Sequence, residues 1–242
     1  MYFCRSVHAM NKVVEIQELG RQAYPDAWEY QEQLFQKIVG IKLANRSAEI
    51  PVLTPNYLLW VTHPHVYTLG KSGSMDNLLL SETQLAQKGA SFYKINRGGD
   101  ITYHGPGQVV GYPILDLENF FTDIHQYLRY LEEAIILTLQ EYGLEATRSE
   151  GETGVWLGVG TPFARKICAM GVRASRWVTM HGFALNVNVN LGYFDHIIPC
   201  GIKGKAVTSL HVELGVSEVD ETEVKQKIAK HFRSLFGCEF LN

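Results

Sequence analysis

The stretch that most constrains this chain runs from Arg97 to Gln108, RGGDITYHGPGQ. Its four glycines and one proline fit neither a helix nor a regular strand, yet apolar runs typical of strands flank it on both sides. The pattern predicts a sheet interrupted by a polar loop. Because two clusters of chain-breaking residues enclose polar side chains such as Tyr103 and His104, we interpret the loop as a ligand-binding wall, with an ordinary turn between strands as the alternative.

Composition restricts the class of protein. A chain of 242 residues, 46% of them hydrophobic and 19% charged, can bury a sizeable core, as soluble globular enzymes do. The net charge of −3, without a long run of like charge, argues against a nucleic-acid surface. No apolar run approaches the roughly 18 residues of a membrane helix, and the N-terminus lacks the unbroken apolar segment of a secretory signal. We therefore expect a cytoplasmic protein.

The chain shows no repeat, low-complexity tract or linker, so we expect a loose leader over residues 1–12 and one domain over residues 13–242. Capping and periodicity predict helices that start at Pro25, after a cap at Thr122, and after Asp220. Strands are predicted at Val13–Leu19, Tyr57–Thr62, Val66–Leu69, Gly154–Val159, Ala164–Arg173 and His181–Leu191. The helices are interpreted as scaffold, and the strands carry the informative residues.

The last predicted strand alternates along its length, which separates its side chains into two faces. Phe183 and Leu185 belong to one face, whereas Gly182 and Ala184 belong to the other. The small residues leave space on their face. A ligand would use that space in one interpretation, and a neighbouring helix would fill it in the other.

Two further motifs carry weaker signals. His63-Pro64-His65 is interpreted as a turn rather than a metal site, because no third ligand lies nearby in the sequence. The loop Gly70–Gly73 could touch an anion, but it lacks the glycine spacing of a phosphate-binding loop.

The four cysteines are scattered, and none has the spacing of a zinc or redox motif. Cys200 lies between a proline and a glycine, in a turn that could present its sulfur to a cleft. Cys168 lies in an apolar strand, where a thiol usually behaves as a small hydrophobe. A reactive thiolate needs a nearby cation or base. Lys166 is the favoured candidate, although its side chain could instead reach solvent, and His104 and His181 are alternative bases.

Five motifs in order resemble the lipoyl(octanoyl) transferase family, the octanoyl-[acyl-carrier-protein]:protein N-octanoyltransferases. They are HPHVYTLGKSG, RGGDITYHGPGQ, KICAMGVR, HGFALNVNVNL, and IIPCGI followed by Thr208-Ser209-Leu210. The resemblance extends from about Leu19 to the C-terminus. It departs from the family at Asn190, where an aspartate is common, and in the unusually basic Lys203-Gly204-Lys205 stretch.

The resemblance implies an α+β catalytic domain of the biotin/lipoate protein ligase type, a mixed sheet flanked by helices, with no cofactor and no metal. It implies transfer of an octanoyl group from octanoyl-acyl carrier protein to a lysine of lipoyl-domain proteins, the first step of endogenous protein lipoylation. The implied acceptors are the lipoyl domains of 2-oxoacid dehydrogenase complexes and the glycine cleavage H protein, with no nucleic-acid or membrane partner.

The resemblance also assigns residues. Cys200 would form the acyl-thioester, and Lys166 would tune its proton affinity. The implied substrate pocket comprises Arg97, Gly98, Gly99, Asp100, Ile101, Thr102, Tyr103, His104, Ala169, Met170, Gly171, Gly182, Phe183 and Ala184.

Two other functions compete with this interpretation. A lipoate or biotin ligase of the same fold would activate a free acid with ATP and needs no cysteine, but the Pro199-Cys200-Gly201 turn and the absence of a GRGRxGR-like stretch count against it. A catalytically inactive protein that only binds lipoyl domains would not need Cys200 at all.

Overall fold

The computed structural model describes residues 10–198 and 206–241. Within them, a nine-stranded mixed sheet has the order β12-β1-β2-β6-β10-β9-β8-β7, with β11 added beside β9. Its strands are β1 (Val13–Arg21), β2 (Tyr57–Thr62), β6 (Gln108–Ile114), β7 (Ala146–Ser149), β8 (Glu152–Leu157), β9 (Arg165–Ser175), β10 (Val178–Asn186), β11 (Ala206–Val207) and β12 (Glu239–Leu241). The β1–β2, β1–β12 and β9–β11 pairs are parallel, and the other pairs are antiparallel.

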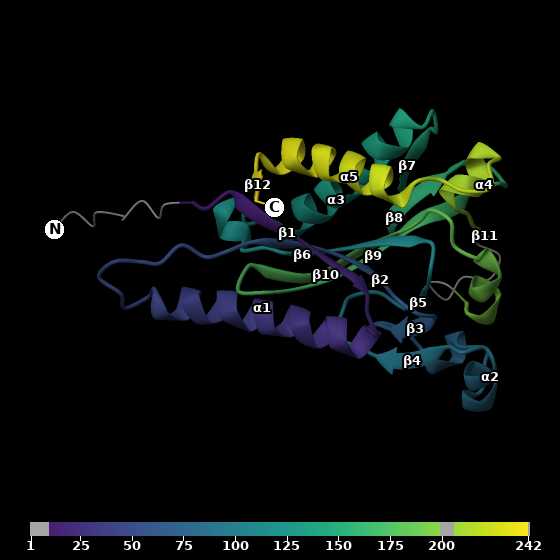
Figure 1. The fold of residues 1–242 in the computed structure, drawn as a ribbon, viewed down its shortest axis with the longest axis horizontal. Helices are drawn as coiled ribbons and strands as arrows, with labels where there is room; N and C mark the ends of the chain where they lie inside the picture. The colour runs from purple at the N-terminus through teal and green to yellow at the C-terminus, as the bar shows by residue number, and fades with distance from the viewer. Residues whose placement is uncertain (1–9, 199–205, 242) are drawn as a thin grey trace.

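A small sheet of order β4-β3-β5 lies beside one end of the large one (Figure 1). It consists of β3 (Val66–Leu69), β4 (Ser91–Lys94) and β5 (Ile101–His104). β5 lies inside the stretch predicted as a polar loop that interrupts a sheet, so that prediction was wrong in part. Its Ile-Thr-Tyr-His sequence is β-branched and aromatic, and it pairs antiparallel with β3 between the two glycine clusters.

Helices cover both faces of the large sheet (Figure 1). The described helices are α1 (Tyr24–Ala44), α2 (Glu82–Gln87), α3 (Ile124–Glu141), α4 (Leu210–Leu214) and α5 (Glu221–Phe236), with short 3-10 turns at Met75–Asn77, Leu117–Asn119 and Leu191–His196. Of these, α2 lies beside the small sheet, next to β4 (Figure 1). In Figure 1, α1 lies below the sheet and α3 and α5 lie above it. This α+β arrangement of a mixed sheet between helices confirms the predicted fold class.

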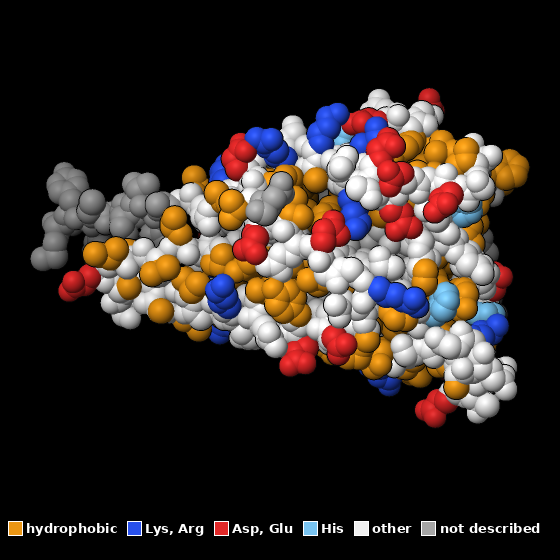
Figure 2. Space-filling view, viewed as in Figure 1, with side chains coloured by type: hydrophobic (Ala, Val, Ile, Leu, Met, Phe, Trp, Pro, Cys, Tyr) orange, Lys and Arg blue, Asp and Glu red, His pale blue; other side chains and the backbone are white. Residues whose placement is uncertain are grey.

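The core is divided by the sheet. One cluster joins the sheet to α3 and α5 through residues such as Leu131 and Phe232, both 0% exposed. A second joins the opposite face to α1 through residues such as Ile38. Figure 2 shows charged side chains of both signs scattered over one face of the molecule, without a stripe of a single sign. None of the helices in the described ranges is long and apolar enough to cross a membrane.

Most predicted element positions agree with the structure, and the differences have local causes. The predictions for β2 and β3 match to the residue. β10 starts three residues earlier than His181 and ends at Asn186, because the backbone N–H groups of Val187 and Asn188 turn to the carbonyl of Gly107. Asp123, not Thr122, caps α3, since its carboxylate accepts from two backbone N–H groups of the first turn.

Candidate functional site

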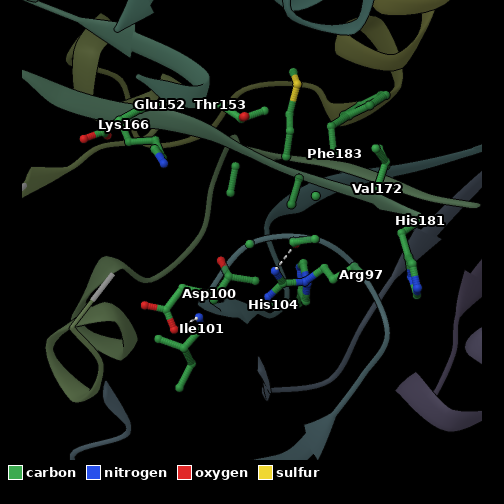
Figure 3. Close-up of a pocket in the computed structure, with 18 of the residues that line it drawn as sticks. Arg97, Asp100, Ile101, His104, Glu152, Thr153, Lys166, Val172, His181 and Phe183 are labelled. Atoms are coloured by element: carbon green, nitrogen blue, oxygen red, sulfur yellow. Dashed lines mark hydrogen bonds between the residues drawn. The ribbon is translucent and has the colours of Figure 1, made fainter. Parts of the chain in front are cut away.

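A cavity of about 540 Å³, here called the central cavity, lies between strands β9 and β10 and the segment that ends in β5 (Figure 3). Its volume is typical of sites for small-molecule ligands, which measure about 300–1,000 Å³. Thirteen of the fourteen predicted pocket residues line it: Arg97, Gly98, Gly99, Asp100, Ile101, Thr102, His104, Ala169, Met170, Gly171, Gly182, Phe183 and Ala184. Lys166 also lines it.

The pairing of β9 with β10 brings the two predicted strand triplets together. Ala169 is the direct partner of Ala184, and Gly171 is the direct partner of Gly182. These four small residues share one face of the sheet, because alternate residues of a strand point the same way. Phe183 alternates to the other side and points away from Arg97 and His104 (Figure 3).

The two glycines do not leave the space that their sequence pattern suggested. A Cβ on Gly182 would lie 2.2 Å from the backbone oxygen of Gly111, and one on Gly171 would lie 2.8 Å from that of Gly98. Gly182 therefore allows close approach of strand β6, which corrects both the ligand and the helix interpretations of its size. Gly171 allows the Arg97–Asp100 segment to rest on β9.

The Arg97–Asp100 segment is fixed by backbone hydrogen bonds. The N–H of Gly98 donates to Val172 of β9 at 2.9 Å. On the other side, the N–H groups of Gly70, Lys71 and Ser72 donate to the carbonyls of this segment. Since those amides are occupied, the Gly70–Gly73 loop does not offer them to an anion, in contrast to the expectation from its glycines.

Arg97 is largely buried at the edge of the central cavity, where 7% of its surface is exposed. Its Nη2 donates to the carbonyl and the hydroxyl of Thr68 at 2.8 and 3.1 Å, and its Nη1 donates to the carbonyl of Gly98 at 3.0 Å. These bonds hold a positive charge beside the cavity and brace the loop that carries it.

Tyr103 is the exception among the predicted pocket residues. Its side chain lies on the opposite face of β5 from Thr102 and His104, because residues of a strand alternate. The ring is fully buried against Tyr193 at 5.0 Å between centroids, and its hydroxyl hydrogen-bonds to Nδ1 of His65 at 2.7 Å. Tyr103 therefore supports the wall from behind, which corrects its prediction as a pocket residue.

Lys166 extends from β9 at one end of the central cavity, near Glu152 and Thr153 (Figure 3). It pairs across the sheet with Trp156 of β8, and its ammonium lies 4.6 Å from the centre of the Trp156 ring. Gly154, at φ +120°, keeps β8 close: a Cβ there would meet the backbone oxygen of Cys168 at 2.5 Å. The alternative in which Lys166 extends away into solvent is wrong, whereas its chemical role stays a prediction.

The central cavity also contains neutral imidazoles. Burial, with help from His63 and Arg97, lowers the pKa of His104 well below its ordinary value. Burial and the charges of Arg97 and Arg173 lower the pKa of His181 to about 3. Both rings are therefore uncharged at neutral pH, and they present hydrogen-bonding groups rather than charges to a ligand.

Cys200, the predicted nucleophile, lies outside the described residues. The described segments on either side of it lie near residues of the central cavity. On one side, the N–H of Ile198 donates to the carbonyl of Asn77, and the Asn77 side chain donates to the carboxylate of Asp100. On the other side, β11 begins at Ala206, which pairs with Arg165 of β9.

The two described cysteines are buried in the core. Cys168 is 0% exposed, and burial raises the pKa of its thiol far above the ordinary range. Burial raises the pKa of the Cys238 thiol to about 11. Neither thiol is suited to form a thiolate, which agrees with the interpretation of Cys168 as a small hydrophobe.

Several cavity residues were not predicted from the sequence. They come from the first residue of α1, from β6, from α3, and from the start of β8 with the glycine before it: Tyr24, Tyr112, Leu128, Gly151, Glu152 and Thr153. Leu128 lies on α3, a helix that was interpreted from the sequence as scaffold. No local motif marks any of them, because only the tertiary fold brings them to the cavity. Among the described residues, no group of three metal-ligating side chains could hold a metal ion.

Comparisons with known proteins identify the family of this chain. Residues 23–233 match the model of the lipoyl protein ligase A/B catalytic domain family. The chain is 75% identical over 232 residues to an octanoyltransferase of Flavobacterium johnsoniae, covering 96% of this chain and 100% of the relative. It is 58% identical to an octanoyltransferase of Cytophaga hutchinsonii, covering 96% of both chains.

Solved structures share the fold at low identity. A bipartite lipoate protein ligase of Thermoplasma acidophilum superposes with a TM-score of 0.66 at 16% identity, covering 97% of this chain and 87% of that one. A lipoate-protein ligase A bound with ATP gives a TM-score of 0.66 at 15% identity, covering 96% and 88%. At such identities the likeness extends to the fold alone, and it confirms the predicted lipoate-ligase type.

Proposed function

Because the chain belongs to the lipoyl protein ligase A/B catalytic domain family and, within it, to the octanoyltransferases, which are acyltransferases, we propose how it carries out octanoyl transfer. The donor is octanoyl-acyl carrier protein, and the acceptor is a lysine of a lipoyl-domain protein. The octanoyl group passes through a thioester on Cys200. The observation that carries this proposal is the position of Lys166 on the wall of a cavity of about 540 Å³ that is floored by small residues.

In the first half-reaction, the Cys200 thiolate attacks the thioester carbonyl of the donor. The bond from carbon to the carrier sulfur breaks, and the carrier leaves as a thiol with a proton that Lys166 can supply. The Lys166 ammonium favours the thiolate form of Cys200 before attack, as an opposite charge does for any nearby acid. The transient oxyanion needs N–H donors. The N–H groups of Gly99 and Asp100 have no acceptor among the described residues and are available for that task.

In the second half-reaction, the lysine amine of the acceptor attacks the acyl-thioester, and an amide forms while the Cys200 sulfur leaves. Exchange between thioesters is nearly balanced and amide formation is downhill, so the proposal includes no ATP. An octanoyl chain has about six methylenes, and their complete burial would contribute roughly 5 kcal/mol to binding. That is enough to hold the acyl group in the cavity between the two steps.

The test compares two donors in the presence of a lipoyl-domain acceptor. Octanoyl-carrier protein without ATP should give octanoylated acceptor, and free octanoate with ATP should not. Cys200→Ala should abolish transfer from the carrier. Activity that requires ATP and free octanoate, and that survives in Cys200→Ala, would instead identify an acid-activating ligase and overturn the proposal.

A further inference from the structure

His104 ends a chain of buried hydrogen bonds that begins at the backbone of Thr208. Asn186 Nδ2 donates to the Thr208 carbonyl at 2.9 Å. Gln108 Nε2 donates to Asn186 Oδ1 at 2.9 Å and to the Tyr103 carbonyl at 3.2 Å. Gln108 Oε1 lies 3.2 Å from Nδ1 of His104. Every link connects residues that are less than one-tenth exposed.

This series of hydrogen bonds determines which ring nitrogen of His104 carries the proton. A backbone carbonyl only accepts hydrogen bonds, so the side-chain NH2 group of Asn186 must face the Thr208 carbonyl. The side-chain oxygen of Asn186 therefore faces Gln108. Gln108 must then donate with its amino group and present its oxygen to His104. An amide oxygen only accepts, so Nδ1 of His104 carries the proton. In the neutral ring, Nε2 is left with a lone pair and no hydrogen.

No group among the described residues donates to that lone pair. His63 lies 5.8 Å from His104 between ring centroids, but its Nδ1 donates to the Gln22 carbonyl and its Nε2 accepts from the Tyr112 hydroxyl. None of the described residues hydrogen-bonds to Nε2 of His104. Since His104 lines the central cavity, the cavity wall contains a fixed acceptor that can receive a hydrogen bond from a donor on a ligand (Figure 3).

The octanoyl group does not provide that donor, because a hydrocarbon chain and a thioester carbonyl have no N–H or O–H. The acceptor lysine does. We propose that Nε2 of His104 accepts a hydrogen bond from the ε-amine of the acceptor lysine and orients its lone pair toward the acyl carbonyl, and that Gln108 and Asn186 are positioning residues for His104. This inference rests on the proposed function.

The amine nitrogen forms a bond to the carbonyl carbon, the bond from that carbon to sulfur breaks, and the nitrogen loses one proton. The leaving thiolate takes that proton to become a thiol. His104 remains neutral throughout, and burial together with His63 and Arg97 keeps its pKa low enough for that. It therefore acts by orientation, and only on nucleophiles that have an N–H.

This selectivity gives a matched control within one enzyme. The isolated octanoyl-enzyme can transfer its acyl group to the lysine of a lipoyl domain or back to the thiol of the free carrier protein. Only the first reaction uses an amine. We expect His104→Asn to slow amine transfer by about 100-fold, because misorientation of a reacting group can cost that much, and to slow thiol transfer by a much smaller factor. The ratio of the two single-turnover rates is the measured quantity.

The choice of variants separates the two ring nitrogens. Asparagine at position 104 retains a donor toward Gln108 but offers nothing at the Nε2 position. His104→Gln extends an amide to that position, so it should recover part of the amine rate. Gln108→Met is nearly isosteric and removes the bond that fixes the ring, and it should lower the same ratio by a smaller factor. Thermal melting of each variant serves as the check on folding.

Two outcomes overturn the inference. The first is that His104→Asn changes neither the amine rate nor the thiol rate, and the second is an equal loss of both rates in a folded variant. Either result would mean that Nε2 of His104 does not orient the amine, and that its lone pair binds only water or acts on the acyl group. A different result would concern the proposed function itself: if the wild-type protein forms no octanoyl-enzyme with octanoyl-carrier protein, the failure lies there and precedes any role of His104.

Discussion

Lys166 and Trp156 are direct partners across strands β9 and β8, and the Lys166 ammonium lies 4.6 Å from the centre of the Trp156 ring. A cation over the face of an indole is attracted by the ring's quadrupole. Trp156 is 3% exposed, so the ring itself cannot move far. The contact therefore limits where the Lys166 charge can be placed in the central cavity.

We predict that this charge sets the reactivity of Cys200. Removing it in Lys166→Ala should raise the pKa of the Cys200 thiol by about one unit or more, because a nearby cation favours the thiolate. The measurement is the rate of Cys200 alkylation as a function of pH, in a Cys168→Ala background. Trp156→Phe retains an aromatic face and should shift the profile less than Trp156→Leu. Identical profiles for wild type and Lys166→Ala would assign the activation to another group.

The floor of the central cavity gives a prediction on acyl chain length. Ala184 is 3% exposed and faces the cavity side of β10, so a leucine there would occupy volume needed by methylenes. Such overpacking costs about 1–3 kcal/mol. Ala184→Leu should lose activity steeply with octanoyl-carrier protein but mildly with butanoyl-carrier protein. Equal losses with both donors, at an unchanged melting temperature, would mean that Ala184 does not contact the methylenes of the acyl chain.

Gly182 should behave differently from its neighbour Ala184. A Cβ at Gly182 would lie 2.2 Å from the Gly111 oxygen and 2.7 Å from Cδ of Pro113, so Gly182→Ala forces strands β6 and β10 apart. We expect a loss of about 1–3 kcal/mol in the free energy of unfolding, measured by chemical denaturation. A stable Gly182→Ala protein with altered chain-length preference would contradict this packing role and would mean that Gly182 is small in order to accommodate the acyl chain.

Buried histidines predict a pH dependence of stability. Burial lowers the pKa of His63 to about 4, against an ordinary value near 6.5. Between these two values the unfolded chain binds a proton that the folded chain does not, so the free energy of unfolding falls as the pH falls. His63 should account for roughly 1.4 kcal/mol per pH unit over this window.

The variant His63→Asn tests that contribution. Asparagine retains a donor toward the Gln22 carbonyl but has no group that titrates in the window. The slope of unfolding free energy against pH, measured between about pH 5 and 6, should become shallower, whatever the absolute stability of the variant. His125→Asn, at an exposed position of α3, is the matched control for the replacement of a histidine by asparagine. An unaltered slope in His63→Asn would contradict the prediction.

Local patterns in the sequence predicted much of the fold. β2 and β3 followed from continuous apolar runs, and the start of α1 followed from Pro25. The boundaries that failed depend on distant partners. β10 ends where Gly107 captures the next two N–H groups, and that contact spans about eighty residues of sequence.

The candidate site was predicted in its parts but not in its assembly. Glycine-rich and small-residue motifs identified the three segments that line the cavity, residues 97–104, 169–171 and 182–184. The pairing of Gly171 with Gly182, however, is a register that no local pattern specifies. Tyr103 was misassigned because the stretch around it was interpreted as a loop, in which residues do not alternate. Leu128 was missed because its spacing on α3 is that of an ordinary core residue.

The most direct test of the central claim is the intact mass of the protein after incubation with octanoyl-carrier protein in the absence of ATP. The wild-type protein and Cys168→Ala should each gain one octanoyl group, and Cys200→Ala should gain none. Addition of a lipoyl domain should then remove the group from the enzyme and place it on the acceptor. An octanoyl group on Cys200→Ala, or acceptor octanoylation by that variant, would contradict a thioester on Cys200.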